Sequence, residues 1–225
     1  MLTAADLAFV ADHLSFVNRL TPQQAQQLAA ACNRALYAPG ALLHNRQEKC
    51  NGLVIVKSGH LRAYFESEDG KEITLFRLLP GNVCILSASC VLKNITFEVT
   101  LAAEKQSEVL FIPAAVWEQL SAANNEVREF SMEIVNERFS EVMWIMEQMV
   151  SRNMGQRIAA FLLQQAEFEK TTALPITHEA IAKNLGTARE VVSRILKYLE
   201  NNNLIQLGRG QVILTDLDGL REMSR

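Results

Sequence analysis

The 225-residue sequence has few of the features that mark disordered, secreted or membrane chains. It contains only 5 prolines and 10 glycines among 49% hydrophobic and 21% charged residues, which excludes fibrous and low-complexity classes. Residues 1–20 have no basic start and include Asp6 and Asp12, so they predict neither a signal peptide nor a membrane span. We therefore expect a cytoplasmic globular protein with no membrane contact, and the length favours two domains.

Motifs for catalysis and for metal binding are missing as well. The patterns GxSxG, HExxH and the P-loop do not occur, so the sequence does not predict an enzyme. The cysteines Cys32, Cys50, Cys84 and Cys90 form no CxxC pair of the kind found in zinc ribbons and redox dithiols. The net charge is −3, of which residues 1–150 contribute −5 (12 basic, 17 acidic) and residues 151–225 contribute +2 (10 basic, 8 acidic). The basic excess therefore lies at the C-terminal end.

The first half of the chain predicts one helix followed by strands. Thr21-Pro22-Gln23-Gln24 has the pattern of a capping box, and we expect a helix of about ten residues that ends near Tyr37. From Pro39 to Pro113, short β-rich runs alternate with turn signals. The runs are 42–45, 52–59, 61–67, 72–79, 95–103 and 108–113. Strands at this spacing, joined by tight turns, indicate an antiparallel barrel or sandwich.

A long helix is predicted after Asn124-Asn125, because no Gly or Pro follows until Gly155. Apolar residues recur within it at spacings of 3, 4, 3, 4 and 3, which is the pattern of a coiled-coil seam. The seam consists of Met132, Val135, Phe139, Val142, Met146 and Met149. The alternative is a core stripe packed on the helix's own domain. Off-seam apolar residues, including Phe130, Ile134 and Trp144, indicate a second surface, so one face can pack on the barrel while the seam meets a second copy.

Residues 177–215 predict two short helices followed by a hairpin. Thr177 is a helix cap and Gly186 is placed to end that helix, while Thr187 with Glu190 resembles a capping box for the next one. Gly208-Arg209-Gly210 then separates two β-rich runs. This arrangement is typical of a winged helix-turn-helix, whose second helix enters the major groove of DNA.

The second helix has side chains suited to base recognition. Arg189 and Arg194 can pair with guanine O6 and N7, and Glu190 can accept a hydrogen bond from cytosine N4. The alternative is that these groups only solvate an exposed helix face. We expect contacts to DNA phosphates from Thr177, His178, Lys183, Thr187, Lys197 and Arg209.

The order of β-rich domain, long helix, TAREVVSRILKYLENNNLI and wing resembles the Crp/Fnr family of transcription regulators over nearly the whole chain. The resemblance implies an α+β fold with an N-terminal antiparallel β-barrel of the cyclic-nucleotide-binding jelly-roll type. It implies a sensing domain over 1–123, a dimerisation helix over 124–150 and a winged helix-turn-helix over 151–225. The implied partners are a second copy, palindromic double-stranded DNA and RNA polymerase. Arg189, Glu190 and Arg194 fall on the family's base-reading positions, and Ser193 matches a position used in the Fnr branch, which leaves the half-site open.

The family's effector residues do not carry over to this chain. An ungapped alignment places the cyclic-nucleotide cassette at Ile85-Leu86 and Phe97-Glu98, which offer a cyclic phosphate neither a cation nor a hydroxyl and so argue against cyclic AMP. Only Cys32 lies in the first 40 residues, which argues against an iron–sulfur cluster. The expected effector pocket consists of Cys84, Leu86, Cys90, Phe97 and Glu98.

The signal itself stays open between several alternatives. The segment PGNVCILSASCVL resembles a subgroup of anaerobe-type regulators. Cys84 and Cys90 could form a thiol switch, or they could be small buried packing residues. Haem is a further alternative, with His44, His60, Cys84 and Cys90 as candidate axial ligands. A different class of function is a ligand-binding or haem/redox sensor module whose helical tail serves protein interaction rather than DNA binding.

Overall fold

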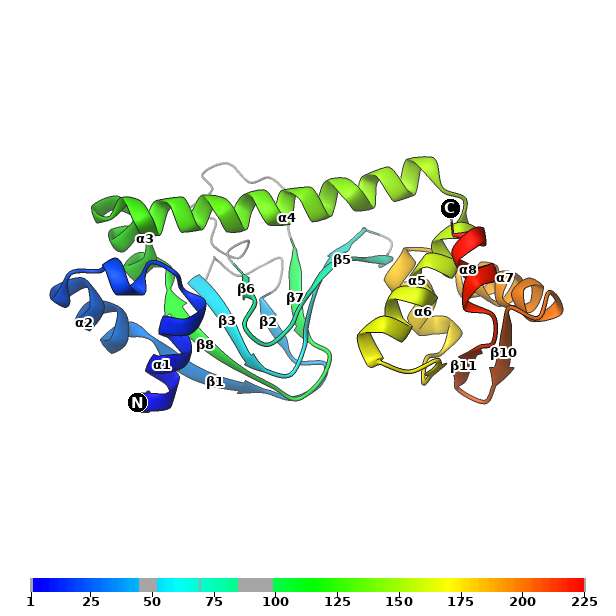
Figure 1. The fold of residues 1–225 in the computed structure, drawn as a ribbon, viewed down its shortest axis with the longest axis horizontal. Coiled ribbons are helices and arrows are strands. Elements are labelled where there is room, and N and C mark those ends of the chain that lie inside the picture. Colours follow the sequence, from blue (N-terminus) through cyan, green and yellow to red (C-terminus); the bar gives the residue numbers. More distant parts are fainter. Residues whose placement is uncertain (1, 45–51, 69, 85–98, 225) are drawn as a thin grey trace. The chain divides into compact units, whose positions relative to one another are not determined.

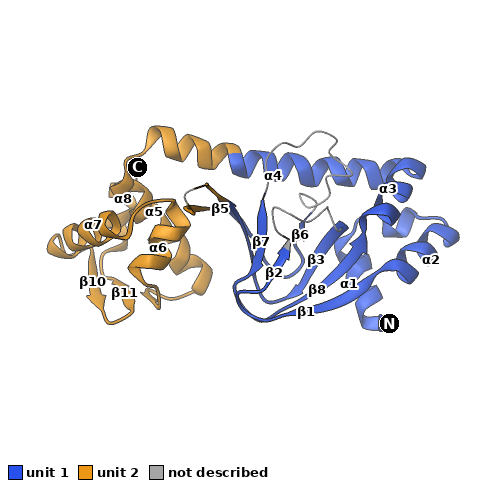
Figure 2. Ribbon diagram, turned by 180° about the vertical axis from the view of Figure 1, so that it is seen from behind, with its two compact units in different colours: residues 1–65, 75–142 blue, residues 66–74, 143–225 orange. Residues whose placement is uncertain are grey.

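The computed structural model describes residues 2–44, 52–68, 70–84 and 99–224 (Figure 1). The chain divides into two compact units, residues 1–65 with 75–142 and residues 66–74 with 143–225 (Figure 2). The first half contains α1 (Ala4–His13), the 3-10 turn η1 (Val17–Arg19), α2 (Pro22–Ala31), β1 (Asn33–Tyr37), β2 (Leu42–His44), β3 (Gly52–Ser58), β4 (Leu61–Glu66), β5 (Glu72–Leu78), β6 (Val83–Cys84), β7 (Thr100–Ala103), β8 (Ser107–Pro113) and α3 (Ala114–Ala123). No helix within the described residues is long and apolar enough to cross a membrane.

The second half is mainly helical. It contains α4 (Asn125–Ser151), α5 (Met154–Glu169), β9 (Ala173–Leu174), α6 (His178–Leu185), α7 (Arg189–Asn201), β10 (Ile205–Gly208), β11 (Gln211–Leu214) and α8 (Leu217–Met223).

The β-domain consists of two four-stranded sheets, with strand orders β1-β8-β3-β6 and β2-β7-β4-β5. Strand β3 is buried on both of its faces. Leu53 and Ile55 pack into a cluster with α1, α2 and α3, whereas Val54 and Val56 pack into a second cluster with residues of β4, β5 and β7. Because successive side chains alternate between the faces of a strand, one strand contributes to two cores. This confirms the predicted α+β fold with an N-terminal antiparallel β-domain.

The helix predicted to end near Tyr37 ends six residues earlier. The capping box is confirmed, since Thr21 accepts from the backbone N–H of Gln24 while the side chain of Gln24 accepts from Thr21. However, α2 ends at Ala31, and Asn33–Tyr37 forms β1, which pairs antiparallel with β8. The five-residue ladder with β8 overrides the local helix preference of this segment, as tertiary context commonly does.

A buried ion pair connects α1 to the sheet. Lys57 Nζ donates to Asp6 Oδ1 at 2.6 Å and to Glu108 Oε1 at 2.8 Å. The Asp6 side chain is fully buried and also accepts from Thr3. The hydrogen bond from Lys57, followed by those from Thr3, holds the pKa of the Asp6 carboxyl well below its usual range. Asp6 is therefore ionised at neutral pH, and its charge is compensated.

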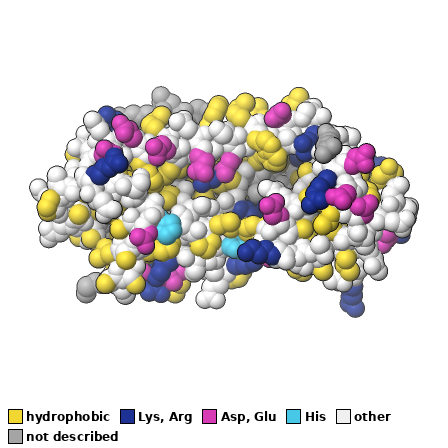
Figure 3. Space-filling view, viewed as in Figure 1, with side chains coloured by type: hydrophobic (Ala, Val, Ile, Leu, Met, Phe, Trp, Pro, Cys, Tyr) yellow, Lys and Arg dark blue, Asp and Glu magenta, His cyan; other side chains and the backbone are white. Residues whose placement is uncertain are grey.

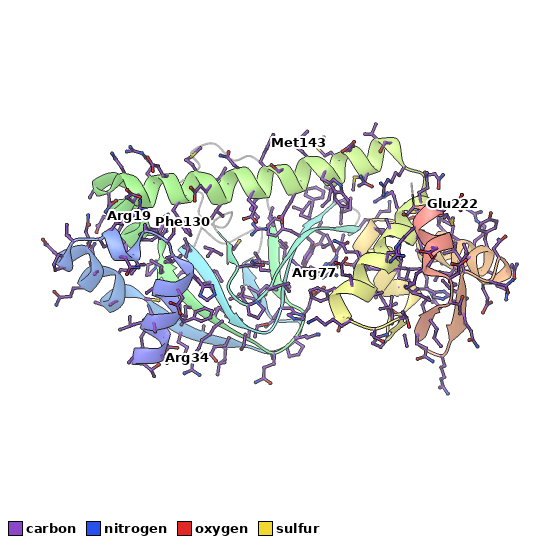
Figure 4. All side chains as sticks on the ribbon, in the orientation of Figure 1. Arg19, Arg34, Arg77, Phe130, Met143 and Glu222 are labelled. Atoms are coloured by element: carbon purple, nitrogen blue, oxygen red, sulfur yellow. The ribbon has the colours of Figure 1, made fainter. Side chains whose placement is uncertain are left out.

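Helix α4 presents two different stripes. Val127, Ser131, Ile134 and Arg138 are buried, at spacings of 4, 3 and 4. Trp117 packs on this side, where its Nε1–H donates to Ser131 Oγ at 3.2 Å, and Phe130 joins the same cluster (Figure 4). Three residues of the predicted seam lie outside this buried stripe, because 49% of Met132, 64% of Phe139 and 52% of Met146 is exposed. These three residues therefore do not belong to the core of their own domain. The seam residue Val135 instead packs against the buried cluster.

Candidate DNA-binding surface

The first helix of the predicted pair begins and ends as the sequence indicates. Thr177 Oγ1 accepts from the backbone N–H of Ala180 at 3.1 Å. Gly186 adopts the left-handed conformation (φ +65°), and the N–H groups of Gly186 and Thr187 both donate to the carbonyl of Ala182. Both predicted caps of α6 are confirmed. The end of the helix is also held by Arg157 of α5, whose Nη2 donates to the carbonyl of Leu185 at 2.9 Å.

The second helix does not begin where the sequence predicts. We expected Thr187 to open it with a capping box to Glu190, but α7 starts at Arg189 and its N-cap is Ala188, with no side-chain cap. The N–H of Thr187 already donates to α6, so it is not available for the capping-box hydrogen bond to the side chain of Glu190. In this kind of helix end, the residue after the left-handed glycine completes the last turn of the preceding helix.

Helix α7 separates apolar and polar residues between two faces. Val192, Leu196 and Leu199 are fully buried in a cluster formed with α5, α6, α8 and the strands β10 and β11. Arg189, Glu190, Arg194 and Lys197 are exposed, and Ser193 is half-buried. The predicted base-reading residues thus share the outer part of one rigid helix, whose inner face is fixed by packing.

The predicted wing is a tight hairpin. Strands β10 and β11 pair in register from Ile205↔Leu214 to Gly208↔Gln211, which places Arg209 and Gly210 in the turn. Strand β9 completes a three-stranded sheet in the order β10-β11-β9. Glu200 at the end of α7 accepts from the backbone N–H of Leu207 at 2.9 Å, so α7 and the wing are connected directly.

Two predicted phosphate contacts sit in contrasting environments. Arg209 is exposed in the wing turn. Lys197 Nζ instead lies 2.7 Å from Glu200 Oε2, and this hydrogen bond, followed by that from the Leu207 N–H, lowers the pKa of Glu200. Because both side chains are solvent-accessible, the pair is weak, and a phosphate can compete with Glu200 for the ammonium group.

A hollow of about 340 Å³ lies between the start of α6, the start of α7 and the wing. Its lining residues are Ile176, Thr177, His178, Glu179, Arg189, Gly208, Gly210 and Gln211. It brings the predicted residues Thr177, His178 and Arg189 together at one concave surface. Lys and Arg side chains appear dark blue in the space-filling view of Figure 3, on the surface of the same domain. The arrangement provides hydrogen-bond donors of the kind that a phosphodiester backbone accepts.

Three features of this surface are not predictable from the sequence patterns. Arg157 supports the end of α6, Gln211 and Glu179 line the hollow, and His178 Nδ1 lies 2.8 Å from Ser193 Oγ. The two residues of the last pair are 15 positions apart and belong to different helices. No spacing pattern could have indicated this contact, because it depends on how α6 packs against α7.

The predicted effector residues are mostly outside the described residues. Cys84 is buried in β6. Leu86, Cys90, Phe97 and Glu98 lie outside the described residues, as do Ile85 and the side chain of His44. Burial raises the pKa of the Cys32 thiol to about 11, so this thiol is unreactive at neutral pH. Among the residues that the structure describes, no group of three His, Cys, Asp or Glu side chains is placed to hold a metal ion.

Comparisons with known proteins agree with this arrangement. Residues 34–124 match the cyclic nucleotide-binding domain, and residues 156–223 match the Crp-like helix-turn-helix domain. The chain is 25% identical over 185 residues to the HTH-type transcriptional regulator Cmr of Mycobacterium tuberculosis, covering 82% of this chain and 73% of that protein. It is 27% identical over 189 residues to the transcriptional activator protein FnrA of Stutzerimonas stutzeri, covering 80% and 76%.

One solved structure resembles this chain over nearly its whole length. It is described as a transcriptional regulator of the Crp/Fnr family from Eubacterium rectale, and it is 37% identical to this chain, with a TM-score of 0.92. The alignment covers 95% of this chain and 99% of the other. The two matched domains, together with the exposed recognition helix and wing, show a DNA-binding transcription regulator without enzymatic function. The chain belongs to the Crp/Fnr family of transcription regulators.

Proposed function

We propose that this regulator binds a palindromic operator as a homodimer, under the control of a small-molecule or redox signal other than cyclic AMP. Residues 1–123 sense the signal, residues 124–150 form the dimer and residues 151–225 bind DNA. RNA polymerase is the further partner that family membership suggests. The segment PGNVCILSASCVL assigns the chain to a subgroup without the cyclic-nucleotide cassette.

The observation that carries the DNA part of this proposal is the composition of the outer face of α7. Arg189, Glu190 and Arg194 are all exposed near the N-terminal half of a helix whose other face is fully buried. In the major groove, the two arginines read guanines and Glu190 accepts from a cytosine amine. Thr177, His178, Lys183, Thr187, Lys197 and Arg209 contribute phosphate contacts, which raise affinity for every sequence alike.

The dimer is supported by the apolar side chains that α4 leaves in water. The seam residues Met132, Phe139 and Met146 are exposed, and so is Met143 on the same helix, which Figure 4 labels. Val135, Val142 and Met149 complete the seam and are half-buried. A row of large apolar residues on one helix is costly in water, and a two-fold copy of the same row would cover it.

The nature of the signal is proposed from residue chemistry. A cyclic phosphate requires a cation and hydrogen-bond donors, and the cassette positions hold Ile85, Leu86, Phe97 and Glu98 instead. We therefore propose an uncharged, apolar or redox signal that acts at Cys84, Leu86, Cys90, Phe97 and Glu98. An absorption spectrum of protein purified without oxygen tests the redox alternatives, because haem and iron–sulfur clusters both absorb visible light. A spectrum with no visible band would leave an organic ligand or the thiols as the signal.

Selection of bound sequences from random DNA tests the operator. The wild-type protein should enrich an inverted repeat whose half-sites are about one helical turn apart, as two-fold helix-turn-helix dimers do. Enrichment of one unrepeated motif would contradict the dimeric mode, and the absence of any motif would contradict sequence-specific binding.

A further inference from the structure

One side-chain contact connects the two helices of the DNA-binding motif. His178 is the first residue of α6, and its Nδ1 lies 2.8 Å from the hydroxyl oxygen of Ser193 on α7. Both side chains are half-buried, so the contact is partly shielded but accessible from the surface. His178 is also the only histidine in residues 143–225 of the sequence. The DNA-binding unit therefore has one side chain of the type whose ordinary charge change falls between pH 5 and 8.

The direction of this hydrogen bond depends on where the imidazole carries its proton. A neutral imidazole with its proton on Nε2 accepts at Nδ1, and Ser193 must then donate its only hydroxyl proton to His178. Ser193 retains lone pairs for DNA and acts as an acceptor. An imidazolium carries protons on both nitrogens, so Nδ1–H donates to Ser193 Oγ, and the hydroxyl proton is released to act as a donor.

We propose that His178 is a positioning residue that sets whether Ser193 donates or accepts a hydrogen bond toward DNA, and that it thereby makes the preferred base at that position depend on pH. This rests on the proposed base-reading role of Ser193. It also uses the proposed phosphate contact of His178, because Nε2–H donating to a phosphate fixes the neutral tautomer in which Nδ1 accepts.

The base code of the major groove gives the direction of the change. In the major groove, cytosine presents only the N4 donor, guanine and thymine present only acceptors (O6 and N7, and O4), and adenine presents both the N6 donor and the N7 acceptor. At high pH, Ser193 as an acceptor favours cytosine or adenine and disfavours guanine and thymine. At low pH, Ser193 as a donor favours guanine, thymine or adenine and disfavours cytosine. A single hydrogen bond of ordinary net strength corresponds to a change of about 2- to 10-fold in relative base preference.

The charged groups beside His178 are one of each sign. Among the described residues, the charged side chains that line the hollow with it are Glu179 of α6 and Arg189 of α7. The wing contributes Gly208, Gly210 and Gln211, which carry no charge.

Selection from random DNA at about pH 5.5 and at about pH 8, on either side of the ordinary histidine range, tests the proposal. The proteins are wild type, His178→Gln and Ser193→Ala. Glutamine keeps a hydrogen-bonding side chain at this position but does not titrate. Wild type should change its preference at one position of each half-site between the two pH values. His178→Gln should select the same base at both, and Ser193→Ala should lose the preference at that position at both.

The possible outcomes separate this proposal from the proposed function. A wild-type motif identical at both pH values overturns it, and so does a change that persists in His178→Gln. In both cases the selected motif still supports operator binding. If no protein selects a motif at either pH, both proposals fail together.

Discussion

Replacing Phe139 by alanine should weaken the dimer without weakening the fold of the subunit. In the isolated chain 64% of Phe139 is exposed, so the side chain contributes little to its own core. Complete burial of a phenylalanine side chain contributes about 1.5–3 kcal/mol. If the partner helix covers the exposed part, Phe139 contributes about 1–2 kcal/mol per subunit and about 2–4 kcal/mol per symmetric dimer.

This free energy converts directly into a dissociation constant. At about 1.4 kcal/mol for each factor of ten, Phe139→Ala should raise the Kd of the dimer by about 30- to 700-fold. Sedimentation equilibrium over a dilution series measures this Kd, and thermal unfolding at high protein concentration checks the fold.

Leu36→Ala is the matched control for this substitution. Leu36 lies on β1 and is also 64% exposed, so the control removes an equally exposed apolar side chain away from the seam. Its dimer Kd should equal that of wild type. If Phe139→Ala sediments like Leu36→Ala, the seam from Met132 to Met149 is not the interface.

Three further predictions concern stability, the recognition motif and the effector. Asp6→Asn should lower the free energy of unfolding at pH 7. The same substitution should make the free energy of unfolding fall less steeply in acid, because the lowered pKa of Asp6 contributes stability that is present above about pH 4 and lost as pH falls. Urea titrations between pH 7 and pH 2 measure the free energy of unfolding and its pH dependence. Thr177→Ala should lower the free energy of unfolding by about 1 kcal/mol through loss of the cap on α6, as measured by thermal unfolding. Thr172→Ala is the control, because Thr172 lies between α5 and β9 and precedes no helix. Calorimetry should detect no binding of cyclic AMP at micromolar concentrations, and clear heat of binding would show that the cassette alignment is shifted.

The sequence predicted those parts of the DNA-binding motif that local chemistry determines. Thr177 and Gly186 act within one turn of their own helix, and the Arg209-Gly210 turn follows from its glycine and the two flanking β-rich runs. For the same reason the barrel strands could be recognised from short runs and turns. The winged helix-turn-helix was therefore predictable without knowledge of the tertiary packing.

The errors came where neighbouring elements compete for the same backbone. Thr187 has the side chain of a helix cap, but its N–H completes the preceding helix, and the N-cap of α7 is Ala188, one residue later than predicted. The strand Asn33–Tyr37 escaped prediction because its pairing with β8 joins residues at least 70 positions apart. The contact between His178 and Ser193 escaped prediction for a similar reason, since it depends on the packing of two helices.

The central claim, that α7 reads base edges, is tested most directly by selection from random DNA with wild type, Arg194→Ala and Lys197→Ala. Arg194 is assigned to a guanine and Lys197 to a phosphate, although both are exposed cations on the same helix. Arg194→Ala should lose about 1–3 kcal/mol on the wild-type site and relax the preference at one base position. Lys197→Ala should keep the wild-type motif, bind all sequences more weakly and show a flatter salt dependence. If Arg194→Ala selects the wild-type motif unchanged, Arg194 does not read a base, which contradicts the claim that α7 reads base edges through this residue.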